Sequence, residues 1–167
     1  SWYDPEGEKA AAQTLLDMDC DVIAQHCDTV YPQSLAQERG VYSIGYNSDM
    51  SKDAPEACLC SVIWNWSAYY TAAVQSVIEG TWDGSNYYGG MSENLVNITS
   101  LADFCAEGTA EKVEEARAAI LSGANGVFDG VIETNTGDTV GEEGKTLDDA
   151  TITGGINWYF KTVSVVD

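Results

Sequence analysis

Three short apolar runs between residues 21 and 66 decide the fold: DVIAQHCD (21–28), GVYSIGYNSD (40–49) and CLCSVIWNW (58–66). Each run ends in polar or aromatic residues, and a helical stretch follows the first and the third. This alternation is typical of parallel strands, and in open α/β sheets the carboxyl ends of such strands line a ligand-binding crevice. The sequence therefore predicts an α/β fold, a three-layer parallel sheet flanked by helices, with functional residues at the strand ends.

Helix signals surround these runs. Asp4 is a good N-cap and Pro5 suits the first helical position, so we expect a helix over residues 5–18. A second helix is expected over residues 32–39. Ser67 is placed to cap a third, which ends at Gly80. We expect the apolar stripe of the third helix to face the sheet; it consists of Tyr70, Ala73, Val74, Val77 and Ile78.

The second half of the chain shows a weaker pattern. Residues 81–108 are rich in turns, with β character near residues 93–99. A strong helix is predicted from Thr109 to Gly123, followed by a hairpin around residues 135–138 and a helical patch near residues 147–153. With no internal repeat and no dividing linker, residues 1–167 are interpreted as one domain.

Charge restricts the partners. The chain has 27 acidic and 7 basic residues, a formal net charge of −20. Phosphate binding needs clusters of Lys and Arg, so neither nucleic acid nor an anionic membrane surface is expected as a partner. No apolar run reaches the ~18–20 residues of a transmembrane helix.

The cysteines offer no metal site. They occupy positions 20, 27, 58, 60 and 105 without paired metal-ligand spacing, so no metal and no cofactor is expected. Free cysteine is often buried, which favours five buried thiols. The alternative is a disulfide between Cys27 and Cys58 or Cys60 in an exported protein. The redox compartment stays open.

His26, the only histidine, follows Gln25 at a predicted strand end. Neighbouring side chains of an extended backbone point in opposite directions, so His26, Cys27 and Asp28 are not expected to converge as a catalytic set. A hydrogen bond from His26 to a ligand, or a histidine satisfied at the strand end, is favoured instead.

Two further groups of residues, one polar and one aromatic, lie near the predicted carboxyl ends of the strands. Asn47 and Asp49 suit hydroxyl or amine groups of a ligand, and an Asx-type turn explains them equally well. Trp2, Trp64 and Trp66 suit stacking on a flat heterocycle, with core packing as the alternative.

Six segments taken together resemble the basic membrane protein family: SWYDP, DVIAQH, IGYNSDM, SVIWNWSAYY, YYGGM and INWYF. Its members include purine-nucleoside receptors, the substrate-binding lipoproteins of ABC importers. The resemblance implies one lobe of a type I periplasmic-binding-protein fold. Residues 1–167 would form the C-terminal ligand-binding lobe, a fragment without the N-terminal lobe and the opening strands.

The resemblance also implies a binding site made of Trp2, Gln25, His26, Asn47, Asp49 and Trp64. Trp64 stands where nucleoside-binding members often carry Lys, and Asn47 where many carry Asp. An aromatic residue in place of the cation favours a free nucleobase such as adenine, sandwiched between Trp2 and Trp64.

The implied function is capture of a purine base or nucleoside for an ABC permease, outside the cytoplasm, in the periplasm or on a lipoprotein anchor. The protein is interpreted as a non-enzyme. A ligand-sensing regulatory module of the same fold is the first alternative, and a nucleoside-processing enzyme using His26, Asp28 or Asp49 is the second. An exposed sheet edge favours a homodimer.

Overall fold

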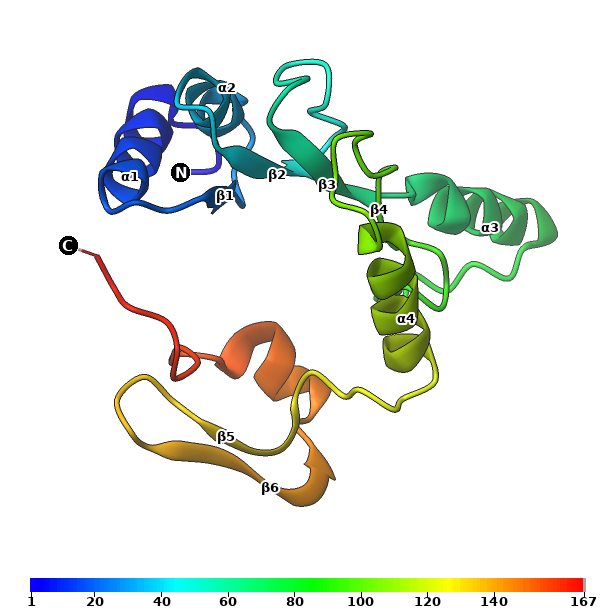
Figure 1. The fold of residues 1–167 in the computed structure, drawn as a ribbon. Helices are drawn as coiled ribbons and strands as arrows, with labels where there is room; N and C mark the ends of the chain where they lie inside the picture. Colours follow the sequence, from blue (N-terminus) through cyan, green and yellow to red (C-terminus); the bar gives the residue numbers. More distant parts are fainter. Residues whose placement is uncertain (167) are drawn as a thin grey trace. The chain divides into compact units, whose positions relative to one another are not determined.

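The computed structural model describes residues 1–166. Its contacts divide the chain into two compact units, Ser1–Ala110 and Glu111–Asp167 (Figure 1). The single lobe predicted for residues 1–167 stays a prediction.

The first unit is built on a four-stranded sheet in the order β1-β2-β3-β4. Strands β1 (Val22–Ala24), β2 (Tyr42–Asn47) and β3 (Cys58–Trp64) are parallel neighbours, and β4 (Val96–Ile98) pairs antiparallel with β3. The predicted parallel strands are confirmed. Their carboxyl ends meet at one edge of the sheet, as parallel pairing requires.

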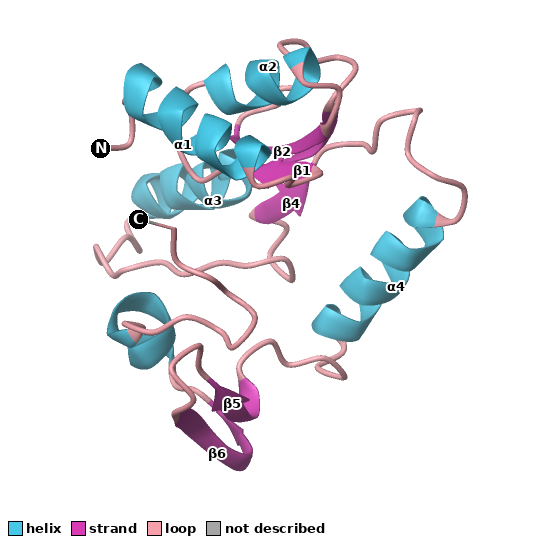
Figure 2. Cartoon of the chain, turned by 60° about the vertical axis from the view of Figure 1, so that its left-hand side comes forward, coloured by secondary structure: helices cyan, strands magenta, loops and turns pink. Residues whose placement is uncertain are grey.

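Helices α1 (Pro5–Asp17) and α2 (Tyr31–Glu38) pack against each other and against β1 (Figure 2). As predicted, Asp4 caps α1 by accepting a hydrogen bond from the Gly7 backbone N–H at 3.1 Å. A cluster of buried apolar residues forms the core between these helices and the sheet. It contains Ala12, Leu16, Ile23, Leu35, Ala36, Met50, Ala54, Ala57 and Cys58.

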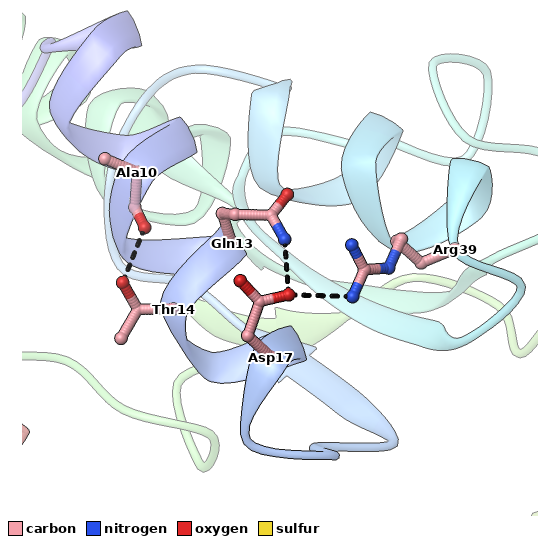
Figure 3. A network of polar contacts seen from close by, with 5 residues as sticks. All are labelled: Ala10, Gln13, Thr14, Asp17 and Arg39. Atoms are coloured by element: carbon pink, nitrogen blue, oxygen red, sulfur yellow. Dashed lines mark hydrogen bonds and ion pairs between the residues drawn. The ribbon is translucent and has the colours of Figure 1, made fainter.

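A polar network joins the C-terminal ends of α1 and α2 (Figure 3). Asp17 Oδ1 accepts hydrogen bonds from Arg39 Nη2 at 2.9 Å and from Gln13 Nε2 at 2.7 Å. The bond from Arg39, then that from Gln13, lowers the pKa of Asp17 below its usual value. Because the pair is exposed to solvent, its contribution to the stability of the fold is small.

Helix α3 (Trp66–Glu79) corrects one expectation from the sequence. It ends at Gly80 with φ 71°, as predicted, but it begins at Trp66 after Asn65, so the expectation that Ser67 caps it is wrong. The helix also buries none of its residues. Val74, Val77 and Ile78 are 60%, 61% and 73% exposed, so the expectation that this stripe packs on the sheet is wrong. Asn65 alone separates β3 from α3, and one residue is shorter than the two to six residues that usually return a helix onto its sheet.

The second unit holds most of α4 (Thr109–Leu121) and a hairpin of β5 (Asp129–Glu133) and β6 (Thr139–Thr146). The predicted helix and hairpin are confirmed. In the turn, the Thr134 N–H donates to the Asp138 carbonyl at 2.8 Å, and Gly137 adopts φ 86°. The predicted helical patch near residues 147–153 is present as a short helix that ends in a π-helical turn, Thr151–Gly155.

Within the described residues 1–166, no helix is both long and apolar enough to span a bilayer. All five cysteines are free thiols, but Cys58 alone is buried and the other four are partly exposed, so the expectation of five buried thiols is wrong. In this structure the alternative of a disulfide from Cys27 is therefore not realised.

Candidate functional site

A row of aromatic side chains follows the carboxyl edge of the sheet. His26 follows β1, Tyr46 lies near the end of β2, and Trp64 ends β3, with Trp2 and Trp66 at the two ends of the row. We refer to these five residues as the aromatic row. The strand ends position its middle members, because parallel strands bring distant parts of the sequence to one edge.

Ring distances show that the row is continuous. The ring centroids of Trp2 and His26 are 5.6 Å apart, and those of His26 and Tyr46 are 4.3 Å apart. Tyr46 meets Trp64 edge to face, with centroids 6.2 Å apart and planes at 89°. Trp64 and Trp66 are also 6.2 Å apart. These separations lie within the range of attractive aromatic contacts.

Trp2 and Tyr46 form the most nearly parallel pair in the row. Their centroids are 6.4 Å apart and their planes differ by 14°. Trp2 is 62% exposed, so its indole can rotate without disturbing the core. Insertion of a flat ring between two aromatic planes needs roughly 7 Å, which is two contact distances of about 3.5 Å. The observed separation of 6.4 Å is slightly less than this, so a ring could enter only if Trp2 moved.

A buried carboxylate holds Trp2 beside the sheet. Glu8 Oε1 accepts from the Asp4 N–H at 2.9 Å, and Glu8 Oε2 accepts from the Thr29 hydroxyl at 2.6 Å and from the Thr29 N–H at 3.2 Å. The Asp28 N–H donates to the Trp2 carbonyl at 2.9 Å. The segment that carries Trp2 is thus tied to the loop after β1.

Acidic and amide groups border the aromatic row. Asn47 ends β2 with φ 68°, and its Nδ2 donates to Asp28 Oδ1 at 3.4 Å. Both side chains are exposed. Asp28 also lines a cavity of about 490 Å³ together with Tyr3 and Lys9.

Asp49 forms the Asx-type turn that the sequence allowed. Its Oδ1 accepts from the Ser51 N–H at 3.0 Å. Hydrogen bonds from the Ser51 side chain and then its backbone, with a smaller effect of the Lys52 charge, lower the pKa of Asp49. The carboxylate is exposed, so it stays accessible while it closes the turn.

Gln25 points away from the aromatic row. Its Nε2 donates to the Thr29 carbonyl at 2.7 Å and to Gln33 Oε1 at 2.8 Å, and it lies 3.1 Å from Met50 Sδ. Gln25 therefore supports the loop beneath the site. Of the six predicted site residues, Trp2, His26, Asn47 and Trp64 lie at the edge, whereas Asp49 lies in the loop beyond β2.

Sequence reasoning missed Tyr46 as a site residue, although Tyr46 contacts Trp2, His26 and Trp64. Its position directly before Asn47 is the signal that could have identified it. Among the residues that the structure describes, no group of three or more His, Cys, Asp or Glu residues could hold a metal ion. The site is aromatic and rich in hydrogen-bond acceptors, which suits a flat ligand with N–H or O–H donors.

Comparisons with known sequences identify related proteins. A family of PnrA-like ABC transporter substrate-binding proteins matches residues 1–127. A purine-binding protein of Brucella abortus is 35% identical over 159 residues, which are 95% of this chain and 45% of that protein. A Haloferax volcanii protein named as the glucose-binding protein of an ABC transporter is 37% identical over 95 residues, 57% of this chain and 24% of its own length. The chain thus spans less than half the length of these curated relatives.

Solved structures share the fold. A transcriptional activator of the comK gene from Bacillus halodurans has a TM-score of 0.67 at 18% identity, covering 75% of this chain and 45% of that chain. An ABC transporter solute-binding protein from Aeropyrum pernix has a TM-score of 0.60 at 18% identity, covering 74% and 44%. These matches support the α/β fold of periplasmic binding proteins. The family match over residues 1–127 shows that the chain belongs to the PnrA-like (basic membrane protein) family of ABC transporter substrate-binding proteins.

Proposed function

We propose that residues 1–167 form the C-terminal ligand-binding lobe of a substrate-binding protein that captures a purine base or nucleoside for an ABC permease. The ligand would lie between this lobe and an N-terminal lobe outside these residues. The whole protein would act outside the cytoplasm, in the periplasm or on a lipoprotein anchor. The observation that carries the proposal is the aromatic row at the carboxyl edge of a parallel sheet.

The proposed chemistry is capture. Trp2, Tyr46 and Trp64 supply stacking surfaces, which every purine can use because every purine has a flat π face. His26, Asn47 and Asp49 supply hydrogen bonds that distinguish the ring edges. The purine-binding relative in Brucella supports a purine ligand, and the glucose-binding relative makes glucose the competitor to test.

The test is a calorimetric titration of this chain with adenine, guanine, hypoxanthine, their nucleosides and glucose. One lobe supplies only half of a two-lobed pocket, so we expect weak, saturable binding of a purine. Trp2→Ala and Trp64→Ala should each weaken it about 5- to 150-fold, because stacking on one aromatic side chain contributes about 1–3 kcal/mol per base. Trp82→Ala is the matched control, since Trp82 is 47% exposed and outside the aromatic row.

Saturable binding of glucose without any purine would refute the proposed ligand. Equal losses in Trp82→Ala and Trp64→Ala would refute the proposed site. Recovery of the nucleosides unchanged after incubation is the expected result for capture, whereas turnover that His26→Ala abolishes would identify an enzyme.

A ligand-sensing regulatory role is the second candidate, because the Bacillus halodurans transcriptional activator has the same fold. The two roles differ in the cell. Deletion of the whole gene should abolish uptake of labelled purine if the protein serves transport. It should change transcription without lowering uptake if the protein serves regulation.

A further inference from the structure

Asp28 and Asn47 form a polar pair beside the stacking surfaces. The Asp28 N–H is bonded to the Trp2 carbonyl at 2.9 Å, and Asn47 directly follows Tyr46. The backbone thus connects Asp28 to Trp2 and Asn47 to Tyr46, and the rings of Trp2 and Tyr46 are nearly parallel. A ring stacked on these aromatics would bring its edge close to the polar pair.

The pair offers a defined pattern of hydrogen-bonding groups. An ionised carboxylate only accepts hydrogen bonds, whereas a carboxamide has two N–H donors and one acceptor. One Asn47 N–H points to Asp28 at 3.4 Å, a long and therefore weak bond. Both side chains are exposed and can turn to a ligand.

We propose that Asp28, with Asn47, determines which purine the site accepts, and that it selects purines with a 6-amino group. The Asp28 carboxylate accepts from the 6-amino group of adenine, while an Asn47 N–H donates to the neighbouring ring nitrogen. Hypoxanthine in the same orientation places a 6-oxo acceptor against the carboxylate, which repels it. This inference rests on the proposed purine site.

The ligands themselves provide the first test. The wild-type chain is titrated by calorimetry with adenine, hypoxanthine and 6-methylpurine, in which a methyl group replaces the amino group at nearly the same size. A site built to hydrogen-bond a ligand rejects an analogue that lacks the group. At a single exposed pair we expect adenine to bind about 10- to 100-fold more tightly than either analogue, since a hydrogen bond to a charged group contributes about 1.5–3 kcal/mol.

The second test is Asp28→Asn, which keeps the shape of the side chain and lets it donate to a 6-oxo group. We expect the ratio of adenine to hypoxanthine affinity to fall at least about tenfold. Asp53→Asn is the control: Asp53 is an exposed carboxylate in the loop after β2, so its removal changes the net charge equally and should leave the ratio unchanged.

Adenine binding by the wild-type chain with no preference over 6-methylpurine, or a ratio that Asp28→Asn does not change, would overturn this inference and leave the proposed purine site intact. Absence of binding by every purine would overturn both. Because the comparison with 6-methylpurine needs no substitution, it decides the matter even if Asp28→Asn fails to fold.

Discussion

The hydrogen bonds of Glu8 lead to a quantitative prediction about the stability of the segment that carries Trp2. Glu8 is 9% exposed, and its carboxylate accepts from three donors, the Asp4 N–H, the Thr29 N–H and the Thr29 hydroxyl. Glu8→Ala would leave these donors without their acceptor. A single hydrogen bond to a charged group contributes about 1.5–3 kcal/mol and neighbouring bonds do not add fully, so we expect the free energy of unfolding to fall by about 2–4 kcal/mol.

The pairing of Glu8 with Thr29 can be isolated by a double-mutant cycle of Glu8→Gln and Thr29→Val. Urea unfolding is followed by tryptophan fluorescence in a Trp158→Phe background, so that all remaining indoles report on Ser1–Ala110. We expect a coupling energy of about 1 kcal/mol or more, because the two residues share a buried hydrogen bond of 2.6 Å. Additivity within about 0.3–0.5 kcal/mol would refute the stabilising hydrogen bond between Glu8 and Thr29.

Three further predictions concern the rest of the chain. Ile78→Asp on α3 should change the free energy of unfolding by no more than about 0.5 kcal/mol, since Ile78 is 73% exposed; a loss of several kcal/mol in urea unfolding would mean that α3 packs on the sheet. Asp17→Asn should lower stability at pH 7. The lowered folded-state pKa of Asp17 means that its contribution is present above the unfolded pKa and is lost as the pH falls through the folded pKa; a stability gap that stays constant down to pH 2 would contradict this. Burial, with smaller effects of Cys58 and Cys105, raises the pKa of Cys60, so iodoacetamide should label Cys60 more slowly at pH 7 in the folded chain than in urea, as measured by peptide mass spectrometry. Equal rates in the two states would rule that out.

Local signals in the sequence were sufficient for most elements of the fold. Apolar runs predict β1, β2 and β3, because a buried strand needs a continuous apolar stretch. Asp4 and Pro5 predict the start of α1 through capping, and residues 135–138 predict the turn of the hairpin. Each of these signals acts within a few residues of the chain.

Contacts between residues that are distant in the sequence decide which side chains pack against a given surface. The apolar stripe of α3 predicts which face of the helix is apolar. The periodicity does not predict what packs against that face, and in the structure no residue of α3 is buried. The family resemblance places Gln25 in the site together with His26, whereas the alternation of side chains along the strand turns Gln25 toward Gln33 and Met50. Tyr46 was missed because a tyrosine in a strand is equally typical of a half-buried sheet position.

The most direct test of the account is to observe the tryptophans while a purine binds. The chain has five tryptophans, and the indole N–H of each gives a separate signal in a ¹H–¹⁵N correlation spectrum. On titration with adenine, we predict saturable shifts of the Trp2 and Trp64 signals, with the Trp82 and Trp158 signals unchanged. Shifts confined to Trp158 or Trp82, or no shift at millimolar adenine, would contradict a purine site at the carboxyl edge of the sheet.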